Sequence, residues 1–351
     1  MRTGGRSPRR GVWSTDDGRH VGATAAHPCR SAAEAAMSLL ALKIDVDTLR
    51  GTREGVPALL DLLRRHQVGA TFLFSVGPDH TGRAIKRIFR PGFFSKVRRT
   101  SVVHHYGMTT LLYGTALPGP DIGRRAADTM RAVRDEGFET GLHCWDHVKW
   151  QDGVAGADAD WTARQMRRAC ERYTEVFKEP PRVHGAAGWQ MNVDALRQTQ
   201  VLGFDYCSDG RGTHPHLPVW NAELIRCPQL PTTLPTLDEL IGIGGATADD
   251  AAARLLALTA PPETDGPLSS HVFTLHAELE GLRLAPTLEL LLNGWKAQGY
   301  RLSSLRRLYE TFEPMALPRC EVGLDPVPGR SGTLLCQRRE FLGDVDLVRA
   351  A

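Results

Sequence analysis

The sequence predicts an α/β fold built on a parallel sheet. Strand-like apolar runs alternate with helical stretches between residues 39 and 302. The composition, with 42% apolar and 24% charged residues in 351, is that of a globular protein and excludes a wholly disordered or collagen-like chain. No stretch approaches the roughly 20 apolar residues that a membrane-spanning helix needs. The alternation leaves open whether the sheet is wound open or closed into a barrel.

The predicted elements follow one another in a regular order. Leu39–Val46 is an apolar run of strand length, 54–66 carries four leucines at helical spacing, and 71–76 is a second apolar strand. Asn192 and Asp249 are predicted to cap the starts of later helices. The other predicted elements are the strands 139–143, 183–186, 205–208, 272–275 and 300–302 and the helices 122–136, 161–177, 193–202 and 288–298.

Both ends of the chain lie outside this pattern. Residues 1–36 are basic and rich in Gly and Ser, and we expect them to be disordered or to result from a translation start placed too early. We expect one folded domain over 37–312, followed by a C-terminal tail over 313–351 that contains Pro and Gly clusters. The seven cysteines form no Cys-x-x-Cys pair, which favours a reducing compartment over a disulfide framework.

Two carboxylates close the first predicted strand. Asp45 and Asp47 are two residues apart, so in an extended chain both side chains point to the same side. Like charges this close are unfavourable unless a cation or a shared proton relieves them. A turn or helix-cap role is the alternative interpretation.

Three histidines stand at the ends of other predicted strands. His143 and His147 are four residues apart and can converge with Asp47 on one metal ion. Two His and one carboxylate leave coordination positions open, which suits catalysis better than structural support. His276 can act as a general acid, because an ordinary His pKa near 6.5 suits proton delivery at neutral pH. Singly, each is equally compatible with a packed or surface His; together they predict a hydrolytic metal site.

Other residues near strand ends are candidates for supporting roles. Asp146 can orient a His ring from behind, and Asp209 can hold His276 in one tautomer. Gly188 would let the backbone approach a ligand closely. Trp189 is either a platform for a sugar or simply a packing residue.

These residues, in this order, resemble the polysaccharide deacetylase family (carbohydrate esterase family 4), whose fold is an irregular (β/α)7-type barrel. The resemblance implies that Asp45 is the catalytic base and His276 the catalytic acid. It also implies that Asp47, His143 and His147 bind one divalent metal ion. Zinc is the first choice from this nitrogen and oxygen ligation, with cobalt, manganese or iron as alternatives. The resemblance runs from about residue 37 to about residue 312, which makes 37–312 the catalytic domain.

Longer runs are similar to a subgroup of the family that removes a formyl group from 4-deoxy-4-formamido-L-arabinose carried on undecaprenyl phosphate. This similarity implies a deformylase in lipid A modification and polymyxin resistance, at the cytoplasmic face of a bacterial inner membrane. It adds Glu278 to the expected substrate-side residues. Gln190 stands where the subgroup has Arg, so either Gln190 donates a hydrogen bond there or Arg211 supplies the charge. The matching runs are RGTREGVP (50–57), FSVGPD (74–79), AAGW (186–189), TLPT (233–236) and HAE (276–278).

Residues 81–117 form a predicted basic amphipathic insertion that faces a membrane. No acidic residue lies between Asp79 and Asp121, whereas seven Lys or Arg interleave with apolar and aromatic residues between 83 and 99. Such a segment suits the surface of an anionic leaflet. An RNA-contacting or merely solvated face is the alternative, but a lipid-linked substrate favours the membrane. The formal net charge of +3 is too small to indicate nucleic acid by itself.

Three other functions remain open. A metal-dependent glycosyltransferase would use Asp45 and Asp47 on a nucleotide sugar but would leave the histidines idle. An N-deacetylase of another amino sugar would use the same residues on an acetyl group. A catalytically inactive membrane scaffold would carry no metal ion. UDP binding, a comparison of formyl with acetyl substrates, and metal content distinguish these functions.

Overall fold

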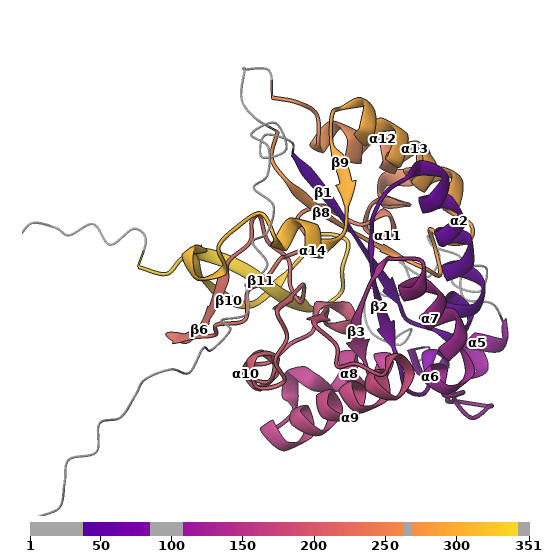
Figure 1. The fold of residues 1–351 in the computed structure, drawn as a ribbon, viewed down its shortest axis with the longest axis vertical. Helices are drawn as coiled ribbons and strands as arrows, with labels where there is room; N and C mark the ends of the chain where they lie inside the picture. Colours follow the sequence, from indigo (N-terminus) through magenta and orange to yellow (C-terminus); the bar gives the residue numbers. More distant parts are fainter. Residues whose placement is uncertain (1–37, 85–107, 263–267, 343–351) are drawn as a thin grey trace, which may run out of the picture. The chain divides into compact units, whose positions relative to one another are not determined.

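The computed structural model describes residues 38–84, 108–262 and 268–342 (Figure 1). These residues belong to one compact unit that spans Ala36–Ala351. The predictions for 1–36 and for most of the insertion 81–117 lie outside the described residues. Among the helices that the structure describes, none has both the length and the apolar character needed to cross a bilayer.

A parallel sheet of seven strands forms the centre of the described chain, which confirms the predicted α/β class. Its order is β5-β4-β3-β2-β1-β8, and β9 pairs with the beginning of β1. The strands are β1 (Leu39–Val46), β2 (Thr71–Ser75), β3 (Glu139–Cys144), β4 (Val183–His184), β5 (Tyr206–Cys207), β8 (His271–His276) and β9 (Arg301–Ser303).

An extended segment at residues 228–234, here called the closing segment, joins the two outer strands of this order. On one side the Cys207 amide of β5 donates to the Pro228 carbonyl at 2.8 Å, and the Leu230 amide donates back to Cys207 at 2.7 Å. On the other side the Thr233 amide donates to the Val272 carbonyl of β8 at 3.1 Å. The sheet is therefore an irregular barrel rather than an open sheet.

The two faces of the sheet carry different side chains. Because successive residues of a strand point to opposite faces, Leu42 packs among the helices while Leu39 and Ala41 pack in a smaller inner cluster. This inner cluster also contains residues of β2, β4, β5, the closing segment and β8. By the same alternation Lys43 and Asp45 of β1 point to the inner side, so the polar end of that strand faces the barrel interior.

Helices cover the outer side of the barrel (Figure 1). The helices of the described chain are α2 (Val56–His66), α5 (Met108–Leu112), α6 (Ile122–Arg125), α7 (Ala127–Asp135), α8 (His147–Gly153), α9 (Ala159–Phe177), α10 (Val193–Val201), α11 (Leu237–Leu240), α12 (Ala248–Leu258), α13 (Ala285–Ala297) and α14 (Leu305–Tyr309). Of these, α14 packs on the inner side, because its Leu305 and Leu308 belong to the inner cluster. Short helical turns are η1 (Gly51–Gly55), η3 (Val154–Gly156), η4 (Ala187–Trp189), η5 (Ile243–Gly245) and η6 (Pro314–Ala316).

Two predicted helix features need correction. The predicted helix 122–136 is divided into α6 and α7, because Ala126 adopts φ −130°, outside the helical region. Asn192 does cap α10 by accepting from the Ala195 amide, but the predicted cap at Asp249 is wrong. Thr247 caps α12 and forms a capping box with Asp250, which satisfies two amides at once.

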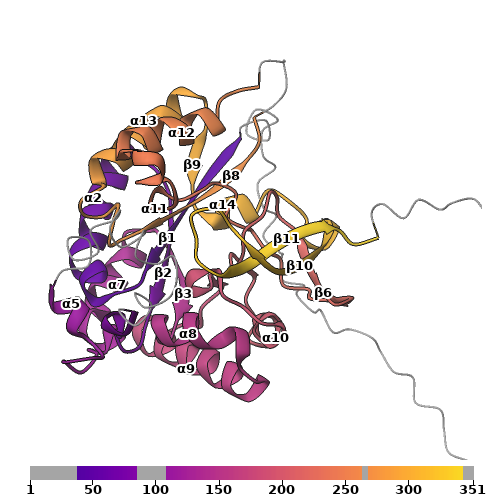
Figure 2. The same ribbon diagram turned by 180° about the vertical axis from the view of Figure 1, so that it is seen from behind.

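A second sheet of four described strands was not predicted. Its order is β11-β10-β6-β7, and Figure 2 shows β10 and β11 beside β6. Its C-terminal hairpin comes from the tail 313–351 and is anchored on the loop after β5, because the Arg211 amide donates to Leu335 at 2.8 Å and the Gln337 amide donates to Arg211 at 2.7 Å. The strands are β6 (Leu217–Trp220), β7 (Glu223–Leu224), β10 (Arg319–Pro326) and β11 (Thr333–Glu340).

Candidate active site and metal centre

Three predicted metal ligands meet at the carboxyl end of the sheet. Asp47 follows β1, His143 lies in β3 and His147 begins α8. One Asp47 oxygen lies 3.2 Å from His143 Nε2, and the other lies 3.4 Å from His147 Nε2. The bulge between Phe74 and Ser75 in the β2–β3 register leaves His143 without a β2 partner, and a bulge of this kind re-aims a side chain.

The environment of these three residues fits a cation. Asp47 Oδ1 and His143 Nε2 are buried without a hydrogen-bond partner. His143 Nδ1 donates to the Gly185 carbonyl at 2.6 Å, which leaves the Nε2 lone pair free to bind a metal. Burial alone would raise the pKa of Asp47, but the charge of His147 and the contacts of His143 hold that pKa well below its usual range. The site thus presents an ionised carboxylate and two imidazoles to one point.

Asp45 and His276 lie side by side next to this cluster. They are register partners on β1 and β8, so both side chains leave adjacent parallel strands at the same height. Asp45 Oδ1 lies 3.9 Å from His143 Nδ1 and is buried without a hydrogen bond. The buried Lys43 ammonium, 3.4 Å from Asp45 Oδ2, compensates the charge of this carboxylate. Lys43 was not predicted as a site residue.

Comparisons with known proteins agree with this geometry. A family model described as polysaccharide deacetylase matches residues 39–207. The chain is 36% identical over 293 residues to the probable 4-deoxy-4-formamido-L-arabinose-phosphoundecaprenol deformylase ArnD of Shewanella sediminis (strain HAW-EB3), covering 84% of this chain and 92% of that protein. It is 30% identical to the protein of the same name from Wigglesworthia glossinidia brevipalpis, covering 82% and 99%.

The chain belongs to the polysaccharide deacetylase family. It is therefore an enzyme of a family that hydrolyses carbon–nitrogen bonds of amides. A crystal structure from Mycobacterium smegmatis, assigned to the polysaccharide deacetylases, superposes with a TM-score of 0.54 at 16% identity, covering 87% of this chain and 99% of that one. That likeness supports the fold alone.

In this polysaccharide deacetylase, Glu280 rather than Asp209 faces His276. The His276 amide donates to Glu280 Oε2 at 2.8 Å, while His276 Nδ1 and Glu280 Oε1 are both buried without hydrogen bonds. The predicted pairing of Asp209 with His276 is wrong, because Asp209 instead accepts from His184 Nδ1 at 2.6 Å. Burial raises the pKa of Glu280 to about 7, against the opposing charge of His276.

Replacing Glu280 by Gln is expected to flatten the pH dependence of stability. Because the folded-state pKa of about 7 lies above the ordinary 4.5, the contribution of Glu280 is complete below pH 4.5 and is lost as the pH rises through 7. At 1.36 kcal/mol per pKa unit, the loss amounts to about 3 kcal/mol. Urea unfolding of the metal-stripped wild type and the metal-stripped Glu280→Gln variant at pH 5 and pH 8 measures this loss. An equal change in the free energy of unfolding between the two pH values in both proteins would refute the prediction.

Glu278 fixes the backbone that carries Asp47. Its Oε1 accepts from the Asp47 amide at 3.0 Å and from the amide and hydroxyl of Thr48 at 2.8 Å. Burial, and next the charge of Asp47, raise the pKa of Glu278 well above its ordinary value. Gly51 packs against this carboxylate so closely that a Cβ there would lie 1.9 Å from Oε1. The predicted substrate-side residue thus acts on the loop that carries Asp47, a predicted metal ligand.

A Gly51→Ala substitution is expected to displace Glu278 and disturb Asp47. We expect a loss of about 1–3 kcal/mol in stability from overpacking and a 10- to 100-fold loss of metal affinity or activity. Gly156→Ala is the matched control, because a Cβ at this exposed position would meet no heavy atom within 4 Å. Thermal unfolding and metal titration of both variants test this, and indistinguishable behaviour would contradict it.

Asp146 caps helix α8 and orients the ring of His80, rather than the ring of a predicted metal ligand. Its Oδ1 accepts from the Lys149 amide at 3.0 Å as the cap of α8, the helix that begins at His147. Its Oδ2 accepts from His80 Nδ1 at 2.6 Å. Asp146 therefore positions His147 through the start of the helix.

Trp189 packs in the protein and offers no sugar platform. Its ring is 2% exposed and lies among the cationic groups of Lys43, Arg211 and Arg330, at 5.3, 5.1 and 4.7 Å from its centroid. Gly188 before it has φ +61°, and a Cβ there would lie 2.3 Å from Gln151 Nε2, so this turn requires glycine.

Neither residue proposed to replace the subgroup's Arg contacts Asp45. Arg211 donates to Glu239 Oε1 at 2.7 Å and to the Leu234 carbonyl at 3.0 Å. Gln190 donates to the Thr333 carbonyl of β11 at 2.6 Å. Lys43, from the same strand as Asp45, is the cation that lies beside that carboxylate.

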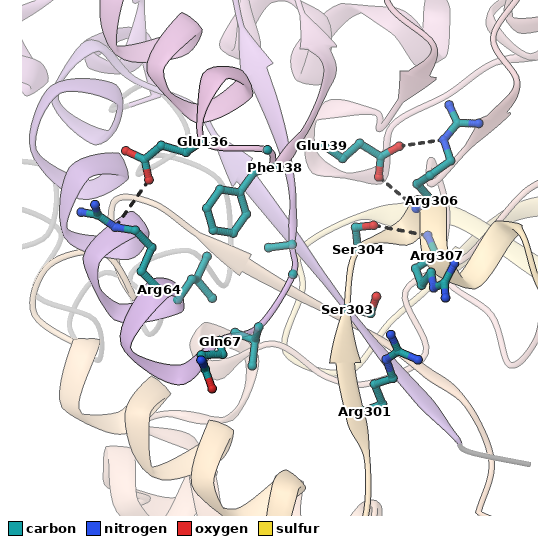
Figure 3. A pocket seen from close by; sticks show the side chains of 15 residues that line it. Arg64, Gln67, Glu136, Phe138, Glu139, Arg301, Ser303, Ser304, Arg306 and Arg307 are labelled. Carbon is teal, nitrogen blue, oxygen red and sulfur yellow. Dashed lines mark hydrogen bonds and ion pairs between the residues drawn. The ribbon is translucent and has the colours of Figure 1, made fainter. Parts of the chain in front are cut away.

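A pocket of about 580 Å³ opens at the opposite end of the strands (Figure 3). Its lining includes residues at the beginnings of β3 and β9 and the residues just before β2. Ion pairs cross its wall, with Arg64 Nε 3.5 Å from Glu136 and Arg306 Nε 3.5 Å from Glu139 (Figure 3). None of the predicted site residues lines this pocket, so it is separate from the candidate active site.

Proposed function

We propose that this enzyme removes the formyl group from 4-deoxy-4-formamido-L-arabinose carried on undecaprenyl phosphate, releasing formate and the 4-amino sugar. The names of the two relatives support this substrate. The single structural observation that carries the proposal is the register pairing of Asp45 with His276 beside Asp47, His143 and His147. That arrangement provides a base, an acid and a cation site within one group of buried and half-buried polar residues.

Asp47, His143 and His147 would hold one divalent cation, with zinc as the first choice and cobalt, manganese or iron as alternatives. Such an ion supplies Lewis acidity, which makes water more acidic and draws charge from an amide oxygen. The orphaned Asp47 Oδ1 and His143 Nε2 are the atoms that best support this assignment.

The protein's own groups then move the protons. Asp45 takes a proton from the attacking water, and Lys43 orients the Asp45 carboxylate from behind. As the carbon–nitrogen bond of the formamide breaks, His276 gives a proton to the departing 4-amino nitrogen. One water is consumed, its hydroxyl ends in formate, and one amine is released. Glu280, which accepts from the His276 amide, positions that acid.

Formate release from the lipid-linked formamido sugar tests this proposal. We expect formate to appear with the metal-loaded enzyme, to stop after EDTA, and to return when zinc is restored. The acetamido analogue on the same lipid is the matched substrate and should react far more slowly. Faster release of acetate than of formate would instead identify an N-deacetylase, and UDP-sugar consumption a glycosyltransferase.

On this proposal the enzyme works at the cytoplasmic face of a bacterial inner membrane, in the lipid A modification that confers polymyxin resistance. The substrate's polyprenyl tail stays in the bilayer, so the enzyme must approach an anionic surface. The basic residues in 81–117 support this, at about 1 kcal/mol per Lys or Arg near the surface. Reversing the charges of Arg87, Lys96, Arg98 and Arg99 should abolish flotation with anionic liposomes, and undiminished flotation would count against this segment.

A further inference from the structure

A second group of metal-binding side chains lies on the other face of the sheet. His184 in β4 and Cys207 in β5 are register partners, and Asp209 follows two residues later, so all three side chains leave the same face. Cys207 packs in the apolar cluster between sheet and helices, whereas Asp45 points to the barrel interior. Donor atoms of these three residues all lie within 4.8 Å of one another. They are therefore separate from the candidate active site.

Burial makes an uncompensated negative charge in this group unfavourable. Asp209 and Cys207 are 0% exposed and His184 is 2% exposed. The Asp209 carboxylate accepts from His184 Nδ1 at 2.6 Å and from Gln229 Nε2 at 2.9 Å. A carboxylate removed from water needs a compensating positive charge, and a divalent cation bound by one carboxylate and one thiolate would leave the group neutral.

A second thiol lies next to the first. Cys227 Sγ is 3.5 Å from Cys207 Sγ, within hydrogen-bond distance of it, but Cys227 is outside the three residues whose donor atoms converge. Burial and the adjoining Cys227 raise the pKa of the Cys207 thiol well above its ordinary value. A thiol that binds a metal ion is deprotonated, so a cation at this group would make Cys207 an anionic donor.

We propose that His184, Cys207 and Asp209 form a second zinc site with a structural role. Imidazole, thiolate and carboxylate are donors that zinc prefers, and the burial of all three residues closes the site to substrate. The ion would tie β4 to β5. It would also brace Gly185, next to His184, whose carbonyl fixes His143 in the candidate active site. This proposal does not depend on the substrate proposed above.

Zinc content of a variant without the catalytic ligands tests the second site. The full chain with His143→Ala and His147→Ala, purified without chelator, is expected to retain about one zinc per chain by mass spectrometry. When cobalt replaces zinc, this double variant should show the near-ultraviolet charge-transfer absorption of a cobalt–thiolate bond. Adding Cys207→Ser should abolish both the absorption and the bound metal. Adding Cys170→Ser, a cysteine of α9 outside the group, should leave both unchanged.

The opposite results would overturn the second site. A double variant that is folded by circular dichroism but free of zinc would do so, as would a cobalt spectrum without the thiolate band or one that survives Cys207→Ser. If the Cys207→Ser protein does not fold, X-ray absorption on the zinc-loaded double variant decides the matter. A sulfur shell at about 2.3 Å supports the proposal, and a shell of nitrogen and oxygen alone refutes it.

Discussion

Replacing Asp45 by Asn is expected to lower formamide turnover by a factor of about 10²–10⁴ while leaving metal content unchanged. Asn is nearly isosteric with Asp but cannot accept a proton from water. The neighbouring Lys43 loses its counter-charge 3.4 Å away, yet none of the three proposed metal ligands is altered. Formate release under saturating substrate, together with zinc content per chain, measures the two effects separately.

Asp128→Asn is the matched control for this substitution. Asp128 lies in the first turn of α7 with a side chain that is 98% exposed, so the same chemical change there should leave turnover at the wild-type level. Near-wild-type turnover in a folded, metal-loaded Asp45→Asn protein would show that Asp45 is not the base.

Replacing Asp47 by Ala is expected to remove the catalytic metal and reduce turnover to background. Asp47 faces both imidazoles, at 3.2 and 3.4 Å, and supplies the only negative charge among the three predicted ligands. Competition with a chromogenic chelator measures the affinity. In this variant the zinc affinity should fall by clearly more than the 10- to 100-fold typical of residues behind a ligand.

Glu278→Gln is the comparison variant, for which we expect a smaller loss of zinc affinity. It keeps all three ligands and changes only the group that accepts from the Asp47 and Thr48 amides, so its loss should stay within 10- to 100-fold. Equal affinities for Asp47→Ala and wild type would contradict the ligand assignment. An equal loss of zinc affinity in Asp47→Ala and Glu278→Gln would contradict the assignment of Asp47 as a ligand and of Glu278 as a residue that only positions it.

The positions of polar residues at the ends of predicted strands were enough to predict that the site residues converge, because this convergence depends on the sheet topology alone. Polar residues that end neighbouring parallel strands meet at one edge of the sheet, which is where Asp45, Asp47, His143 and His276 lie. The same reasoning does not specify a face. Asp209 also ends a strand, but it lies two residues after Cys207 and so shares the helix-covered face with His184.

The remaining errors have equally local causes. Lys43 was missed because a single Lys inside an apolar strand carries no motif, and only the inner position of Asp45 two residues later gives it a partner. Glu280 follows its strand in an irregular turn, where spacing predicts no direction. The hairpin β10–β11 was missed because its second strand, Thr333–Glu340, is apolar in its first half and mostly charged in its second half. This sequence does not show the alternation of apolar and polar residues that predicts a strand.

Anomalous diffraction from crystals grown with zinc, measured above and below the zinc absorption edge, tests the central claim most directly. We expect a peak bonded to the Asp47 carboxylate, His143 Nε2 and His147 Nε2 at about 2.0–2.2 Å. Asp45 and His276 should flank its open coordination positions. Zinc-containing, active crystals without a peak between these three residues would contradict the account.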